Sequence, residues 1–168
     1  MGSGSSGLYS GTGGSQPYAE KYHVVKSELS KDKSDSDIYN KNSGYFKNPT
    51  ATKLDSAISG DRIEFNGKRA EGSMTYVMDS RGNIIFGKRC NPNDGRKRSP
   101  HPTLIGGKDP QVQCAGMITF RKGKIFSINN SSGHFRPNIK SMEKVNSALN
   151  KLYTKNPNLF HKDSKWRK

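Results

Sequence analysis

Two mainly apolar, β-rich runs between polar segments in the middle of the chain predict a first β-hairpin. Met74–Asp79 and Asn83–Gly87 are both rich in β-branched and aromatic residues. The loop between them, Ser80-Arg81-Gly82, places a glycine where a hairpin needs a positive φ. Upstream, Arg62–Phe65 alternates between polar and apolar residues and is followed by Asn66-Gly67, a strong turn signal. The residues after that turn are too polar to predict a convincing partner strand.

A second hairpin is predicted further along the chain. The two alternating runs, Gln113–Arg121 and Lys124–Asn129, flank Lys122-Gly123. If that pair forms a two-residue turn, counting back along both strands places Cys114 opposite Ser131. This register brings the thiol close to the small-residue corner that follows the hairpin.

Helical periodicity appears only near the two ends of this region. Downstream, four apolar residues form one stripe of a helix: Met142, Val145, Leu149 and Leu152. Asn138 is the predicted N-cap, and Asn156-Pro157 ends the helix because a residue before proline avoids the α region. Upstream, residues 54–58 carry apolar side chains at helical spacing and predict one short helix that ends at Gly60.

These elements predict an α+β domain, a small antiparallel sheet of about four to five strands with the C-terminal helix packed on it. Residues 1–7 look like an added tag, and residues 8–51 are so rich in Gly, Ser, Lys, Asp and Asn that we expect a long disordered linker. The folded domain is assigned to residues 52–160, and residues 161–168 form a basic tail. An apolar content of only 30% agrees with a folded part shorter than the chain.

Charge is distributed unevenly and favours an anionic partner. Residues 1–80 contain ten Lys or Arg and ten Asp or Glu, so the whole net charge of +15 arises after residue 80. Such a field suits RNA or an acidic host protein, although a merely solubilising surface is the alternative. The candidate phosphate-binding or substrate-binding residues are Lys88, Arg89, Arg96, Lys97, Arg98 and Arg136. The loop that holds the first five can also be an exposed loop whose charge is incidental.

Two cysteines make neither a disulfide framework nor a zinc site, and we predict no metal. The chain has no apolar run of transmembrane length, so no membrane-spanning segment is expected. We expect a monomer.

Residues from position 101 onward resemble a known module. The matching pieces are His101 with Thr103, Gly106-Gly107, Ala115-Gly116, Gly123, and Ser132-Gly133-His134-Phe135 with Pro137. The pattern His-Ser-Ser, Ala-Gly, Ser-Gly-His-Tyr-x-Pro is similar to a module at the C-terminal ends of bacterial secreted toxins, of polymorphic or Tc type, and of effectors. It also occurs in plant IQ-motif calmodulin-binding proteins. This chain departs from it at Pro102 and Thr103, at Met117 and at Phe135.

The resemblance implies a bacterial virulence domain that is secreted and translocated into the cytoplasm of a target cell. It also implies a carrier toxin shell or an immunity protein as a partner. It does not specify a reaction, so several remain open.

The favoured reaction is ADP-ribosyl transfer from NAD to a host macromolecule. His101 and Thr103 would bind the cofactor while the basic loop holds its phosphates. Enzymes of this class use a catalytic glutamate, and the second half of the chain offers only Glu143. Glu64 or Glu71 would otherwise take that role.

Two other reactions and one binding role are the alternatives. Cys114 with His134 as base, and Ser132 or Asn130 as orienting group, would give a thiol deamidase, transglutaminase or protease. His101 and His134 together would give a metal-independent ribonuclease. A non-catalytic basic binding module, in which both histidines are architectural, would need none of these reactions.

Overall fold

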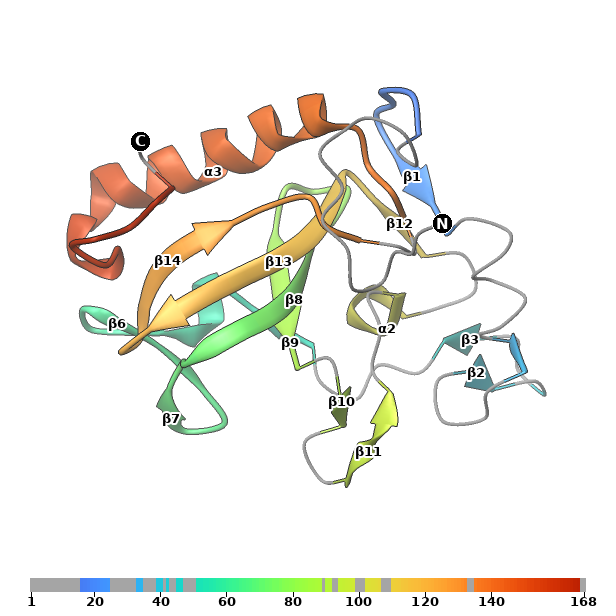
Figure 1. Cartoon of the computed structure of the whole chain (residues 1–168), viewed down its shortest axis with the longest axis horizontal. Coiled ribbons are helices and arrows are strands. Elements are labelled where there is room, and N and C mark those ends of the chain that lie inside the picture. Colours follow the sequence, from blue (N-terminus) through green and yellow to red (C-terminus); the bar gives the residue numbers. More distant parts are fainter. Residues whose placement is uncertain are drawn as a thin grey trace.

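A five-stranded antiparallel sheet forms the centre of the computed structural model, with the strand order β14-β13-β8-β9-β4 (Figure 1). The structure describes residues 16–24, 33–34, 39–40, 42, 45–46, 51–88, 90–91, 94–98, 102–106, 110–132 and 135–166, and only the backbone at 45–46, 90–91, 94–98 and 102–103. The sheet strands are β4 (Thr52–Lys53), β8 (Gly72–Met78), β9 (Ile84–Gly87), β13 (Cys114–Arg121) and β14 (Lys124–Ile128). With the helix that covers it, this sheet confirms the predicted α+β fold.

Shorter elements surround the sheet. The strands are β1 (Tyr22–His23), β2 (Tyr39–Asn40), β3 (Tyr45–Phe46), β5 (Ile58–Ser59), β6 (Arg62–Phe65), β7 (Lys68–Arg69), β10 (Cys90–Asn91), β11 (Asp94–Arg98) and β12 (Gln111–Val112). The helices are η1 (Asp55–Ala57), α2 (Pro102–Ile105), η2 (Ile139–Ser141), α3 (Met142–Lys155) and η3 (Pro157–Leu159).

The first predicted hairpin is confirmed as β8 and β9, which pair from Met78 opposite Ile84 onward. Asp79 closes its loop, because its Oδ1 accepts hydrogen bonds from the backbone N–H of Arg81 (2.9 Å) and of Asn83 (2.8 Å). A carboxylate that binds nearby backbone N–H groups is a common way to stabilise a tight turn.

The second hairpin is confirmed, but its register changes along the strands. Arg121 pairs with Lys124 across a turn with two positive φ angles, as predicted. A bulge between Thr119 and Phe120 then shifts the pairing by one residue, and β14 ends at Ile128. The predicted pairing of Cys114 with Ser131 is therefore wrong, because β14 stops before that position.

Two predictions for the upstream segment need correction. The short helix expected over residues 54–58 is only the one-turn η1, and Ile58 begins β5, which pairs with β6. The turn at Asn66 and Gly67, with φ angles of 54° and 78°, does make a hairpin with the polar strand β7. Turn geometry outweighed the polar composition of the partner strand here.

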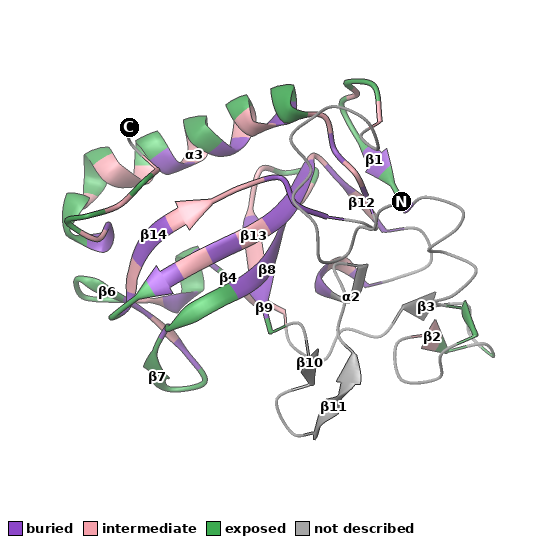
Figure 2. Ribbon diagram, viewed as in Figure 1, coloured by how far each residue is buried: buried purple, intermediate pink, exposed green. Residues whose placement is uncertain are grey.

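Helix α3 covers one face of the sheet, and Figure 2 shows its buried residues on the side turned toward the strands. Val145 and Leu149 are fully buried in the same cluster as Tyr76 and Ile118 of the central strands. The Oδ1 atom of Asn138 accepts a hydrogen bond from the backbone N–H of Lys140 (3.0 Å), so it caps η2, which leads into α3. The predicted stripe, and the end of α3 before Pro157, are confirmed.

The opposite face of the sheet buries a second cluster. It joins Val77 and Ala115 of the central strands to Leu104 of α2, Phe135 and Tyr22. Tyr22 belongs to β1, which pairs with β12, and its hydroxyl lies 2.7 Å from the Oγ atom of Ser141. Residues 16–24 thus belong to the folded part, although they lie inside the segment predicted as a linker.

The chain crosses over the sheet at Gly116 immediately after β14. A Cβ atom at Gly116 would lie 2.0 Å from the carbonyl oxygen of Asn129, so only glycine fits. That oxygen accepts a hydrogen bond from the Tyr76 hydroxyl (2.6 Å). The Oδ1 atom of Asn129 accepts one from the backbone N–H of Met117 (3.0 Å). We call this contact the Gly116 crossing.

Replacement of Gly116 by alanine should destabilise the fold by about 3 kcal/mol or more, because backbone atoms that cannot move aside occupy the site. Urea unfolding measures the loss. Gly60→Ala is the control, since nothing lies within 4 Å of its Cβ position and only its positive φ should cost about 1–2 kcal/mol. Equal losses in the two variants would contradict the crossing.

Candidate ligand groove

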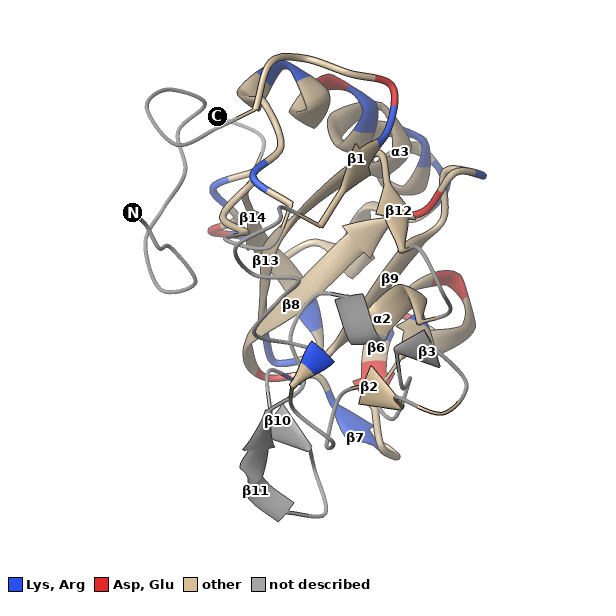
Figure 3. Cartoon of the chain, turned by 90° about the vertical axis from the view of Figure 1, so that its right-hand side faces the viewer, with Lys and Arg blue, Asp and Glu red and all other residues tan. Residues whose placement is uncertain are grey.

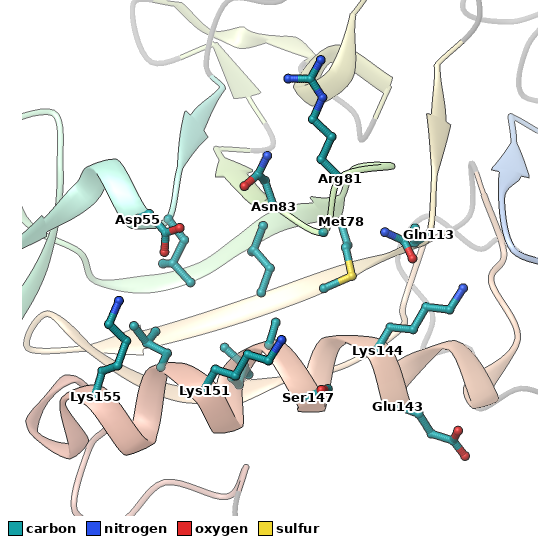
Figure 4. A pocket seen from close by; sticks show the side chains of 16 residues that line it. Asp55, Met78, Arg81, Asn83, Gln113, Glu143, Lys144, Ser147, Lys151 and Lys155 are labelled. Carbon is teal, nitrogen blue, oxygen red and sulfur yellow. The ribbon is translucent and has the colours of Figure 1, made fainter.

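A groove of about 580 Å³ lies between α3 and the strand ends and loops around β8 and β9 (Figure 4). We call it the α3 groove. Its apolar lining consists of Leu54, Met78, Ile84, Ala148, Leu149 and Leu152. Polar and charged residues complete it: Asp55, Arg81, Asn83, Gln113, Glu143, Lys144, Ser147, Lys151 and Lys155. A pocket of a few hundred Å³ with an apolar lining and few polar groups is the usual form of a small-molecule site.

Three lysines run along one side of α3 beside this groove. Lys144, Lys151 and Lys155 are separated by seven and four residues, which places them in one row on an α-helix. Lys and Arg positions along α3 are also visible in Figure 3. The row places positive charge along one side of the apolar lining of the α3 groove. Sequence analysis assigned the basic site to another part of the chain and missed this row.

Lys144, at one end of the row, already has partners. Its ammonium lies 3.3 Å from a carboxylate oxygen of Glu20 and 5.5 Å from the ring centre of Tyr18. Burial acts to lower the pKa of Lys144, but hydrogen bonds and charge interactions with Tyr18 and Glu20 outweigh it and raise this pKa. Lys151 and Lys155 are exposed. Because Glu20 is itself mostly exposed, its ion pair with Lys144 is weak and a ligand could displace it.

One carboxylate faces the groove from the sheet side. Asp55, in η1, points toward α3 opposite Lys155, whereas Glu143 extends away on the far side of the helix (Figure 4). The other two predicted carboxylates have partners elsewhere. Glu64 forms an ion pair with Arg62 (2.7 Å), and Glu71 accepts a hydrogen bond from the backbone N–H of Lys122 (2.7 Å). Asp55 was not predicted from sequence, because no local pattern shows which loop faces a helix ninety residues later.

The predicted histidine site lies mostly outside the described residues. His101, Gly133 and His134 are among those that the structure does not describe, and Thr103 is described only as backbone in α2. Their expected meeting at the hairpin edge stays a prediction. Leu104 and Phe135, which follow these segments directly, share the buried cluster on the face opposite the α3 groove.

The described residues of the predicted motif hold the chain in place. Ser132 is fully buried, and its Oγ accepts a hydrogen bond from the backbone N–H of Phe135 (3.3 Å). Its carbonyl accepts another from the backbone N–H of Arg136 (2.8 Å), and Gln16 donates its backbone N–H to the Arg136 carbonyl (2.8 Å). Together with the Gly116 crossing, these contacts fix the path from β14 to α3.

Cys114 is a free and fully buried thiol. Its Sγ lies 3.7 Å from the Tyr76 hydroxyl and 3.8 Å from the sulfur of Met142. Burial raises its pKa to about 11, and the hydrogen bond to Tyr76 only partly opposes this effect. Because thiolate is the reactive form, this environment is unfavourable for the thiol mechanism.

Of the predicted phosphate-binding residues whose side chains the structure describes, Lys88 and Arg136, neither lines the α3 groove. Lys88 is exposed, with its ammonium 6.0 Å from the ring centre of Phe65. Arg89 lies outside the described residues, and positions 96–98 are described only as backbone in β11. Arg136 is half-buried beside the second cluster, with a φ of 45°.

Comparison with known proteins yields no match to a family model, to a curated protein or to a solved structure. Within the part of the chain that the structure describes, no helix is long and apolar enough to cross a membrane. Among the same residues, no three His, Cys, Asp or Glu side chains gather in a way that could hold a metal ion.

Cys114 should react slowly with a thiol reagent in the native state. In a Cys90→Ser variant, where it is the sole thiol, alkylation near pH 8 should be about a hundredfold slower in buffer than in urea, because a pKa of about 11 leaves little thiolate and burial limits access. Mass spectrometry follows the reaction. Comparable rates in the two solutions would contradict the buried environment and revive a nucleophilic role.

Proposed function

We propose that this protein is a bacterial toxin or effector domain that binds NAD in the α3 groove and transfers its ADP-ribosyl group to a macromolecule of the target cell. The observation that carries this proposal is a row of lysines along an apolar groove, with one carboxylate, Asp55, opposite Lys155 at the end of that row. The resemblance of its motifs to secreted toxin modules supports the toxin assignment, delivery into the target-cell cytoplasm, and a carrier or immunity protein as partner.

The binding part rests on size and charge. A volume of about 580 Å³ lies within the usual range for ligand pockets and suits a dinucleotide that leaves one end outside. Lysine ammonium groups bind phosphate oxygens through charge-assisted hydrogen bonds. Lys151 and Lys155 would therefore hold the diphosphate, while the apolar lining would pack against a base or the nicotinamide ring.

The chemical part rests on Asp55. When the bond between nicotinamide and C1′ of the ribose breaks, its electron pair leaves with nicotinamide and positive charge develops at C1′. A carboxylate placed near that carbon stabilises the developing charge. The acceptor nucleophile then bonds to C1′ and loses its proton. Asp55 would thus take the role that sequence analysis assigned to glutamate.

Replacement of both Lys151 and Lys155 by alanine should weaken NAD binding roughly tenfold, because two phosphate contacts are lost. Isothermal titration calorimetry measures the affinity. Lys68→Ala is the matched control, since Lys68 is an exposed lysine on β7 outside the groove. An unchanged affinity in the double variant, or no binding of NAD at about 1 mM, would overturn the proposal.

The Asp55→Asn variant should retain NAD binding within about twofold but lose transfer by about a hundredfold to a thousandfold. The substitution keeps the size of the side chain and removes only its charge. Labelled NAD incubated with cell lysate reports transfer to protein or RNA. If transfer is undiminished while binding is intact, Asp55 is not the stabilising carboxylate.

A further inference from the structure

A second hollow of about 760 Å³ lies at the end of the domain where the β13–β14 turn, η3 and the C-terminal segment come together. We call it the Trp166 hollow. Its lining combines Lys122, Lys124 and Lys162 with the aromatic rings of Tyr153, Phe160 and Trp166. No Asp or Glu is among the residues that line it. Unlike the lining of the α3 groove, its lining therefore combines lysines with aromatic rings and includes no carboxylate.

The three rings form one connected group. The centre of the Phe160 ring lies 5.0 Å from that of Trp166 and 5.3 Å from that of Tyr153. The indole N–H of Trp166 donates a hydrogen bond to Oδ1 of Asn146 (3.0 Å), which fixes the orientation of the ring. Trp166 and Tyr153 are only half-buried, so parts of both rings reach the surface. A preorganised aromatic surface binds flat ligands at little cost in side-chain entropy.

Positive charge continues around this group. On β14, the Phe126 ring has the Arg121 guanidinium 3.6 Å from its centre and the Lys165 ammonium 5.9 Å from it. A further hollow of about 540 Å³ adjoins Trp166, and the charged residues in its lining are Lys140, Lys165 and Glu143. Trp166 thus lies between two hollows that both carry lysines, which is a surface able to follow a chain of phosphates.

We propose that the Trp166 hollow binds single-stranded nucleic acid, with bases stacked on Trp166 and Tyr153 and phosphates contacted by Lys122 and Lys162. Aromatic rings set among cations are the combination by which proteins hold single strands without sequence preference. An acidic peptide would use the cations but not the rings, and a duplex keeps its bases stacked and out of reach. This site is separate from the α3 groove and does not depend on NAD binding.

The sole tryptophan of the chain provides a direct test. Addition of a uridine 12-mer to the full chain should quench Trp166 fluorescence, because the indole stacks on a base. In parallel, the anisotropy of a labelled 12-mer gives the affinity, which should fall roughly tenfold in Trp166→Leu and much less in Trp166→Phe. Circular dichroism and thermal unfolding check that the variants are folded.

A separate double variant tests how much the lysines contribute to nucleic-acid affinity. Lys122→Ala with Lys162→Ala leaves the rings in place and should lower the slope of log affinity against log salt by about 1.4, since each phosphate contact on a single strand contributes about 0.7. Lys53→Ala with Lys68→Ala is the matched control and should leave this slope unchanged, because both lysines are exposed and line neither the Trp166 hollow nor the α3 groove.

Three results would overturn the proposal. One is binding without quenching, and another is equal affinity in Trp166→Leu and the wild type. The third is displacement of the 12-mer by polyglutamate at the same charge concentration, which would identify an acidic-protein surface instead. A DNA 12-mer run beside the RNA shows whether the 2′-hydroxyl contributes, and either outcome of that comparison supports a single-strand site.

Discussion

The contact between the Asn129 carbonyl and Gly116 is the constraint on which the rest of this fold depends. β14 is an edge strand, and after it the chain must pass over β13 to reach the second buried cluster before returning to begin α3. The passage is possible only because Gly116 has no side chain. The Tyr76 hydroxyl stabilises it by donating a hydrogen bond to the Asn129 carbonyl oxygen. Burial of the carbonyl is acceptable because this hydrogen bond satisfies it. The position of α3, and hence of the α3 groove, follows from this passage.

The Gly116 crossing also gives several residues of the motif a physical role. Ala115 is buried against the second cluster, Gly116 admits the crossing chain, and Ser132 closes the turn before Phe135. These three members of the motif thus have architectural roles. The groups best placed to bind a ligand, Asp55 and the lysine row of α3, lie outside the motif, on the face of the sheet opposite Ala115 and Phe135.

Local patterns predicted the elements whose stability is local. Runs of β-favouring residues and turn glycines identified both central hairpins. The spacing of Val145 and Leu149 identified α3, because a helix with one buried face repeats its apolar residues at the helical period. What could not be predicted depends on contacts between distant segments. The bulge at Thr119 shifts the strand register, and β1 pairs with β12 across almost ninety residues. The α3 groove belongs to this second kind, because η1, the β8–β9 loop and α3 form it together.

We propose that a ligand binds on the α3 face of the sheet, and that Ala115, Gly116 and Ser132 of the motif have architectural roles. Backbone amide chemical shifts recorded by NMR during a titration with NAD test this directly. If NAD binds in the α3 groove, the amide shifts of Asp55, Gln113 and Lys151 should change, and those of Leu104 and Phe135 should not. Shift changes at Leu104 and Phe135, with none along α3, would place the ligand beside the second buried cluster and contradict binding in the α3 groove.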